Sequence, residues 1–213
     1  GGAHNILNMS FNQSDINFTS GATGRLNVKW YLDIFVNDSS GDVQDANVTA
    51  YDKDNSEIFS SLTAVTGYIV QENLTEYNHN ISGRSYLTNY TLNTTKTDYL
   101  ADSRKINLTG NYQENVTLTV QTSPNITVPT IAPSPAYVED SLNCSATPTD
   151  AEQTTLNVSF TWYEDGAANS SFDSNNQSTN NTLTYTGSLV TGLVKGEEWI
   201  CSVRTYDGYD WSN

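Results

Sequence analysis

Basic residues, long apolar runs and histidine are scarce in this chain of 213 residues. It has 9 lysines and arginines against 24 aspartates and glutamates, which gives a formal net charge of −15. An acidic surface repels nucleic acid and anionic lipid, so neither is expected as a partner. No stretch approaches the roughly 20 consecutive apolar residues of a transmembrane helix, so no membrane span is expected.

Signatures of catalysis are missing as well. Histidine occurs only at His4 and His79. The sequence has no nucleophile elbow, no zinc-protease motif and no phosphate-binding glycine loop, and its carboxylates are scattered over turns. Residues 52–57 faintly resemble a calcium loop but lack the glycine at its sixth position, which favours an ordinary polar turn. We therefore expect no enzyme, no metal site and no cofactor apart from covalent N-glycans.

Asparagine, in contrast, is abundant and its placement is not random. Of 25 asparagines, 17 begin an Asn-X-Ser/Thr sequon, far more than chance placement would give. In several of these the middle residue is aliphatic; on a strand that residue points into the core, while its neighbours point to solvent. We predict heavy N-glycosylation and an extracellular or cell-surface location, with the chain in its mature form because no secretion signal is visible at Gly1. The sequons begin at Asn8, Asn12, Asn17, Asn37, Asn47, Asn73, Asn80, Asn89, Asn93, Asn107, Asn115, Asn125, Asn143, Asn157, Asn169, Asn176 and Asn180. Sequons with an aliphatic middle residue include those that begin at Asn47, Asn107, Asn115, Asn125 and Asn157.

Alternation of apolar and polar residues is the main structural pattern, and no segment shows a helical period over a useful length. The clearest strand covers residues 26–36, where Leu26, Val28, Trp30 and every second residue after them are apolar. A serine- and asparagine-rich loop is expected over 167–181. The pattern predicts an all-β fold of two tandem β-sandwich (immunoglobulin-like) domains with an N-terminal extension strand.

Proline indicates where the two domains meet. Residues 123–135 hold four of the five prolines, which is typical of a stiff extended linker. We therefore expect a leader over 1–22, a first sandwich over 23–122, the linker over 123–135 and a second sandwich over 136–213.

The first domain carries the stretch I-F-V-N-D-S-S-G-D-V-Q-D-A-N-V-T-A-Y-D, from Ile34 to Asp52, followed by E-I-F-S-S-L-T and G-Y-I. Residues 26–121 thereby resemble the carboxypeptidase-regulatory-like and CnaB-like family of transthyretin-type sandwiches. Asp45 stands where that family usually has glycine. The resemblance implies a spacer or adhesive module without catalysis.

The second domain carries Cys144, Trp162 and Cys201, within stretches such as S-F-T-W-Y-E-D-G and W-I-C-S-V-R-T-Y-D-G-Y-D-W-S. This arrangement resembles the immunoglobulin core, and residues 137–211 look like immunoglobulin-like repeats of archaeal surface proteins. The resemblance implies a disulfide between Cys144 and Cys201 with Trp162 packed on it, and export would favour its oxidation.

An immunoglobulin-like sandwich has one more strand after the strand that bears the second cysteine, and the residues after Asp207 are too few to form it. Unpaired sheet edges recruit strands from other chains. The leader offers such a strand with Ile6, Leu7, Met9 and Phe11, of which the last three would make one apolar face.

Our hypothesis is that residues 1 to about 18 of one subunit complete the sandwich of the next. Such donor-strand complementation builds a head-to-tail homopolymer, a pilus-like filament. The leader could complete the second domain, the first or both. The alternatives are a fragment of a multidomain cell-surface or S-layer-like adhesin, and a carbohydrate-binding module.

Overall fold

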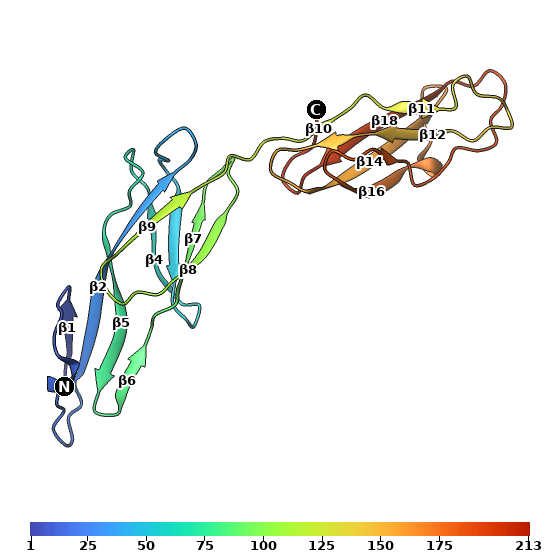
Figure 1. Ribbon diagram of the computed structural model, residues 1–213. Coiled ribbons are helices and arrows are strands. Elements are labelled where there is room, and N and C mark those ends of the chain that lie inside the picture. Colours follow the sequence, from blue (N-terminus) through green and yellow to red (C-terminus); the bar gives the residue numbers. More distant parts are fainter. The chain divides into compact units, whose positions relative to one another are not determined.

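The computed structural model describes residues 1–213, apart from the side chain of Gln13. The chain divides into two compact units, Gly1–Val120 and Gln121–Asn213, and each consists of packed β-sheets (Figure 1). Helical structure in the described chain is limited to two short 3-10 turns, η1 (Gln13–Asp15) and η2 (Ser170–Phe172). Among the residues that the structure describes, no helix is long and apolar enough to cross a membrane. The predicted all-β sandwich class is confirmed.

The first unit packs a five-stranded sheet against a four-stranded sheet. In the five-stranded sheet β2 pairs with β1, β5 and β9, and β5 also pairs with β6; the second sheet has the order β4-β3-β7-β8. The bounds are β1 Ala3–Leu7, β2 Arg25–Asn37, β3 Asn47–Tyr51, β4 Glu57–Leu62, β5 Glu72–Asn80, β6 Gly83–Tyr86, β7 Tyr90–Thr95, β8 Asp102–Ile106 and β9 Tyr112–Thr117.

Strand β2 organises this unit because it is 13 residues long and pairs along both edges. Its alternate residues Leu32, Ile34 and Val36 are fully buried between the sheets, as the sequence alternation predicts. One edge pairs antiparallel with β5. The other edge pairs in parallel with β1 along its first part and with β9 along its last part.

The two parallel partners of β2 meet at a pair of asparagines. The side chain of Asn111 accepts a hydrogen bond from the backbone N–H of Tyr31 at 3.0 Å and donates one to Asn8 Oδ1 at 2.7 Å. The leader strand therefore completes the first unit of its own chain.

The remainder of the leader differs from the prediction. Strand β1 ends at Leu7 because Asn8 adopts a left-handed conformation with φ of 53°, which asparagine tolerates better than most residues. The chain then turns through η1, so within this chain Leu7, Met9 and Phe11 do not share a strand face. Their pairing with a second copy stays a prediction. Met9 is left 59% exposed, and Phe11 is half-buried.

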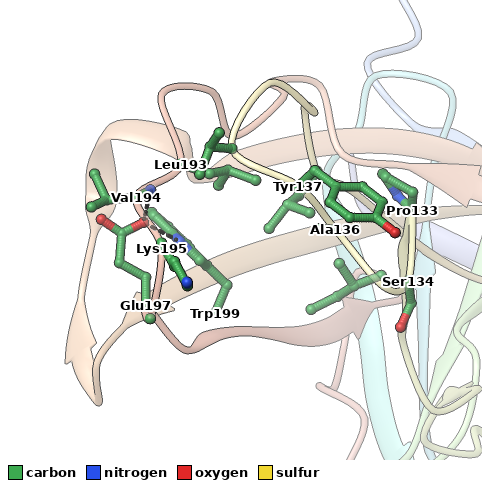
Figure 2. Close-up of a pocket in the computed structure, with 13 residues that line it drawn as sticks. Pro133, Ser134, Ala136, Tyr137, Leu193, Val194, Lys195, Glu197 and Trp199 are labelled. Carbon is green, nitrogen blue, oxygen red and sulfur yellow. Dashed lines mark hydrogen bonds between the residues drawn. The ribbon is translucent and has the colours of Figure 1, made fainter.

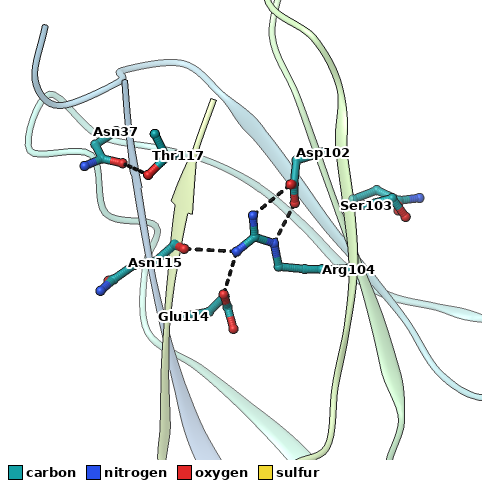
Figure 3. A network of polar contacts seen from close by, with 8 residues as sticks. Asn37, Asp102, Ser103, Arg104, Glu114, Asn115 and Thr117 are labelled. Carbon is teal, nitrogen blue, oxygen red and sulfur yellow. Dashed lines mark hydrogen bonds and ion pairs between the residues drawn. The ribbon is translucent and has the colours of Figure 1, made fainter. Parts of the chain in front are cut away.

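A charged network ties the two sheets of the first unit together at one side (Figure 3). Arg104 on β8 forms bonds of 2.6 and 2.7 Å to the two carboxylate oxygens of Asp102. It also donates to Glu114 Oε1 at 2.7 Å and to the carbonyl of Asn115 at 3.0 Å, both on β9. Hydrogen bonding to Asp102 raises the pKa of Arg104 above its ordinary value. Because β8 and β9 belong to different sheets, the network joins their edges.

The second unit has two main sheets and a small β10–β13 ladder. One sheet has the order β11-β12-β17; in the other, β14 pairs with β15, β16 and β18. The bounds are β10 Asn125–Ile126, β11 Thr130–Ala132, β12 Asn143–Ala146, β13 Pro148–Thr149, β14 Thr155–Glu164, β15 Ala167–Ala168, β16 Ser174–Thr179, β17 Thr184–Tyr185 and β18 Trp199–Tyr206.

Two segments predicted to be irregular form strands instead. Within the expected linker over 123–135, β10 pairs with β13 and β11 pairs with β12, so this segment belongs to the second unit. Its prolines are tolerated because they flank β10 and β11 and none lies within either strand, so no ladder loses an N–H. Within the expected loop over 167–181, β16 pairs with residues Thr155–Phe160 of β14.

Candidate functional site

The candidate site is the strand that carries the second cysteine, and it lies on a cross-linked core. A disulfide joins Cys201 on β18 to Cys144 on β12, with 6.4 Å between their Cα atoms, so it connects the two main sheets. Trp162 on β14 lies opposite Cys201 in the strand register and is fully buried. Its ring meets Trp199 edge to face, with 6.2 Å between the ring centroids. The core beneath β18 is therefore rigid and apolar.

One edge of β18 is paired and the other is largely open. The strand pairs with β14 along its whole length, from Trp199 to Tyr206. Its inward residues Cys201, Val203 and Thr205 are buried, while Ile200 is 46% exposed on the outer face. Within the described residues, no strand pairs with the opposite edge over 199–204.

A short hairpin covers only the last part of this edge. The chain turns at 207–210, Trp211 pairs with Tyr206, and the N–H of Ser212 donates to the carbonyl of Thr205 at 2.8 Å. Thr205 thus directs its backbone groups away from β14, and by the period of two Cys201 and Val203 do the same. Their N–H and C=O groups form a ready ladder for another strand.

A cavity of about 600 Å³ opens at the beginning of the open edge. Trp199 of β18 and Ile131 of β11 both line it. Loop residues 133–137 lie along one side and 193–197 along the other (Figure 2). Because β11 and β18 are edge strands of the two facing sheets, the cavity lies where the sandwich is uncovered.

The lining of the cavity is mainly apolar. Tyr137 is 71% exposed and Val194 is 63% exposed, so large apolar side chains face solvent there. Glu197 Oε2 accepts hydrogen bonds from the backbone N–H of Val194 at 2.8 Å and from Trp199 Nε1 at 3.1 Å. The carboxylate thereby holds the indole of Trp199, which also meets the ring of Phe172 at 5.8 Å.

The cavity was not predicted from the sequence. Trp199, which lines it, is half-buried. Residues 136–138 and 193–194 are apolar but lie outside any alternating strand, which is the one sequence signal that could have indicated a recess. The predicted donor residues Ile6, Leu7, Met9 and Phe11 belong to the first unit, where Ile6 and Leu7 lie on β1. Among the described side chains, no group of three His, Cys, Asp or Glu residues could hold a metal ion.

The structure also places the predicted glycosylation sites. None of the 17 sequon asparagines is buried. The middle residues Val48, Leu108, Val116 and Val158 point into the cores, as predicted. Thr49 departs from the prediction that it faces solvent, since it is buried in the middle of the β4-β3-β7 sheet.

One sequon asparagine has a structural role that competes with a glycan. The Nδ2 atom of Asn180, to which a glycan would be attached, donates hydrogen bonds to the carbonyls of Asp150 at 2.6 Å and Gln153 at 2.8 Å. Its Oδ1 accepts a third bond from the N–H of Asp150. These bonds hold the turn after β13.

Comparisons with known proteins show no close relative. No protein family model matches this sequence. No curated protein matches it either. Nine chains of solved structures match, and three of them have TM-scores between 0.29 and 0.34. A DUF3823 family protein of Parabacteroides merdae has a TM-score of 0.34 and 13% identity, covering 83% of this chain and 90% of that one. A proposed carbohydrate-binding protein of Bacteroides uniformis has a TM-score of 0.30 and 6% identity, covering 84% and 91%. The TIE protein of Bacillus anthracis has a TM-score of 0.29 and 12% identity, covering 82% of this chain and 32% of that one.

Proposed function

We propose that this chain is a non-catalytic structural subunit of a glycosylated extracellular filament, assembled by adding a β-strand to the open edge of β18. The observation that carries this proposal is the unpaired edge over residues 199–204, which lies beside an apolar cavity and above a disulfide-linked core. An edge of this kind gains main-chain hydrogen bonds and apolar contacts from an incoming strand.

The donor in this proposal is the N-terminal segment of a second copy. None of the β1 side chains is fully buried, so releasing β1 from β2 costs mainly backbone hydrogen bonds that β18 can replace. Met9 is exposed and Phe11 lies outside any strand, so both are available for new contacts. A donor in one unit and an acceptor in the other give a head-to-tail contact, which propagates into an open filament.

Electron microscopy and sedimentation of the native full chain test this proposal. We expect fibres of repeating two-lobed subunits. Met9→Asp should abolish them, because a carboxylate would have to enter the core of the acceptor. Val65→Asp is the matched control, since Val65 is 71% exposed in a turn of the first unit and plays no part in the contact. Monomeric particles of the unaltered chain, or fibres that persist with Met9→Asp, would contradict the donor assignment.

An extracellular location is supported by the disulfide, which persists in oxidising compartments, and by the exposed sequons. Native material should therefore have an intact mass above the 23.4 kDa of the bare chain. Enzymatic removal of N-glycans should return the mass to that value. A native mass equal to that of the bare chain would exclude glycosylation.

A multidomain surface adhesin is the alternative that the hairpin favours. The pairing of Trp211 with Tyr206 directs any following strand antiparallel to β18, so a longer polypeptide could cover the edge itself. In that case neighbouring polypeptide, and not a second copy, would fill the edge in a map of the native assembly.

A carbohydrate-binding module is the second alternative. It is favoured by the rings of Tyr137 and Trp199 and the charged groups of Lys195 and Glu197 in one cavity, because sugars stack on aromatic faces and bond to polar groups at the rim. A glycan array probed with the full chain tests it, with Tyr137→Ser as the variant that should lose any signal.

A further inference from the structure

The cavity beside β18 has a geometry that assigns it a specific occupant. Resting on the proposed function, we propose that the cavity is an anchor pocket for Phe11 of the incoming strand, and that this strand pairs with β18 in one defined register. In that register Leu7 lies opposite Val203, Met9 opposite Cys201 and Phe11 opposite Trp199.

The direction of the incoming strand follows from the hairpin. Trp211 and Ser212 already occupy the edge next to Tyr206 and Thr205, and they run antiparallel to β18. The next free positions are therefore those opposite Val203, Cys201 and Trp199, in that order. In the proposed register the incoming strand extends the hairpin's line, and it therefore runs in the same direction, antiparallel to β18.

The spacing of the leader matches these positions. Residues directly opposite each other in an antiparallel pair lie on the same face of the sheet. Val203 and Cys201 are buried on the inner face, so the incoming strand needs apolar residues at three alternate positions. Leu7, Met9 and Phe11 have this spacing, although in the first unit they do not lie on one strand.

The outer face fits the same register. Asn8 falls opposite Ser202 and Ser10 opposite Ile200, and both of these β18 residues are exposed. Asn8 begins a sequon, and in this register its side chain stays in solvent, so a glycan there would not block the contact. A shift by one residue would turn Asn8 and Ser10 into the core and Met9 out.

The cavity matches the side chain of Phe11 in size and in apolar character. Its lining is mainly apolar, and it includes Trp199, directly opposite Phe11 in the proposed register, together with Tyr137 and Leu193. A volume of about 600 Å³ accommodates a phenyl ring and the backbone that carries it. Aromatic rings meeting edge to face, as Trp199 already meets Trp162, are a favourable arrangement.

Two single-cysteine variants of the full chain test the register. Asn8→Cys and Ser202→Cys would face each other in a non-hydrogen-bonded pair, where Cα atoms are about 4.5 Å apart and a disulfide can form. Both native cysteines are already bonded to each other, so they do not interfere. Mixing the two variants under mild oxidation should give a covalent dimer that neither variant gives alone. Asn12→Cys mixed with Ser202→Cys, four residues out of register, should give at least tenfold less.

The pocket is tested by adding a second substitution to the acceptor, beside Ser202→Cys. Val194→Asp places a carboxylate in the cavity and should lower the cross-linked yield at least tenfold. Val128→Asp is the matched control, since Val128 is 87% exposed in the same unit and does not line the cavity. Phe11→Ala in the donor should lower the yield to a similar degree.

The outcomes separate the pocket from the proposed function. If Asn8→Cys and Ser202→Cys cross-link and neither Val194→Asp nor Phe11→Ala lowers the yield, the anchor pocket is overturned while strand addition stands. Preferential cross-linking through Asn12 would overturn the register. No cross-link with any pair would overturn both the inference and the donor assignment.

Discussion

Reduction of the Cys144–Cys201 disulfide should destabilise the second unit alone. The bond spans a sequence separation of 57 residues and connects the two main sheets. Releasing a loop of this size restores conformational entropy to the unfolded chain worth about 4 kcal/mol. Because small domains are stabilised by only about 5–15 kcal/mol, the reduced unit should lose a substantial part of its stability, between about a quarter and four fifths. The two thiols occupy nearly the space of the bond, so no cavity adds to this figure.

Urea unfolding followed by hydrogen exchange and mass spectrometry can assign the loss to each unit. With a urea dependence of about 2 kcal/mol per molar, the midpoint of the second unit should fall by about 2 M on reduction. The first unit contains no cysteine and is an internal control. A midpoint change in the second unit below about 0.5 M, or an equal change in both units, would refute this reasoning.

Three further predictions concern single side chains. Arg104→Met should destabilise the first unit by about 2 kcal/mol in urea unfolding, because charge-assisted hydrogen bonds contribute roughly 1.5–3 kcal/mol, whereas Lys53→Met, at an exposed ion pair, should change stability by less than about 1 kcal/mol. Equal effects would show that the link between the sheets does not matter. Burial raises the pKa of Tyr90 from 10.0 to about 12, so this tyrosine's contribution to stability should be complete below pH 10.0 and lost as the pH rises toward 12. Tyr90→Phe should flatten that alkaline loss in pH-dependent melting curves. Glycopeptide mapping should find Asn107 occupied and Asn180 empty, because both amide hydrogens of Asn180 are used by backbone carbonyls; a glycan at Asn180 would contradict its role in the turn.

Strands with strict alternation could be predicted from the sequence. In β2 every second residue is apolar, and Leu32, Ile34 and Val36 are buried as that pattern requires. Strand β5 could not be predicted in this way because its residues do not alternate between apolar and polar. Its neighbouring residues Glu76 and Tyr77 are both buried, since a bulge interrupts the β2–β5 register and the Glu76 carboxylate accepts a hydrogen bond from Trp30 Nε1 at 2.7 Å.

Strand β16 could not be predicted from the sequence because its residues are all polar. Its residues S-N-N-Q-S-T include no apolar side chain, so no periodicity marks the strand. Backbone pairing with β14 fixes it, and that depends on tertiary structure. The candidate site likewise combines a feature that a local sequence pattern reveals with one that depends on tertiary structure. The strand that bears Cys201 could be predicted from its alternation, whereas the cavity is lined by two loops far apart in sequence, around Tyr137 and Val194, whose proximity no local pattern reveals.

The parallel pairing of β2 with β9 has a mechanical consequence. The chain enters β2 near the start of the first unit and leaves β9 near its end, and the two strands run the same way over six register pairs. A pull along the polypeptide would therefore slide these strands past each other, and all their hydrogen bonds would resist at once. In an antiparallel hairpin pulled at its open end, by contrast, the hydrogen bonds between the strands would break one after another. The strand order thus makes the first unit stiff against stretching, which is the load that a protein tethered at a cell surface experiences.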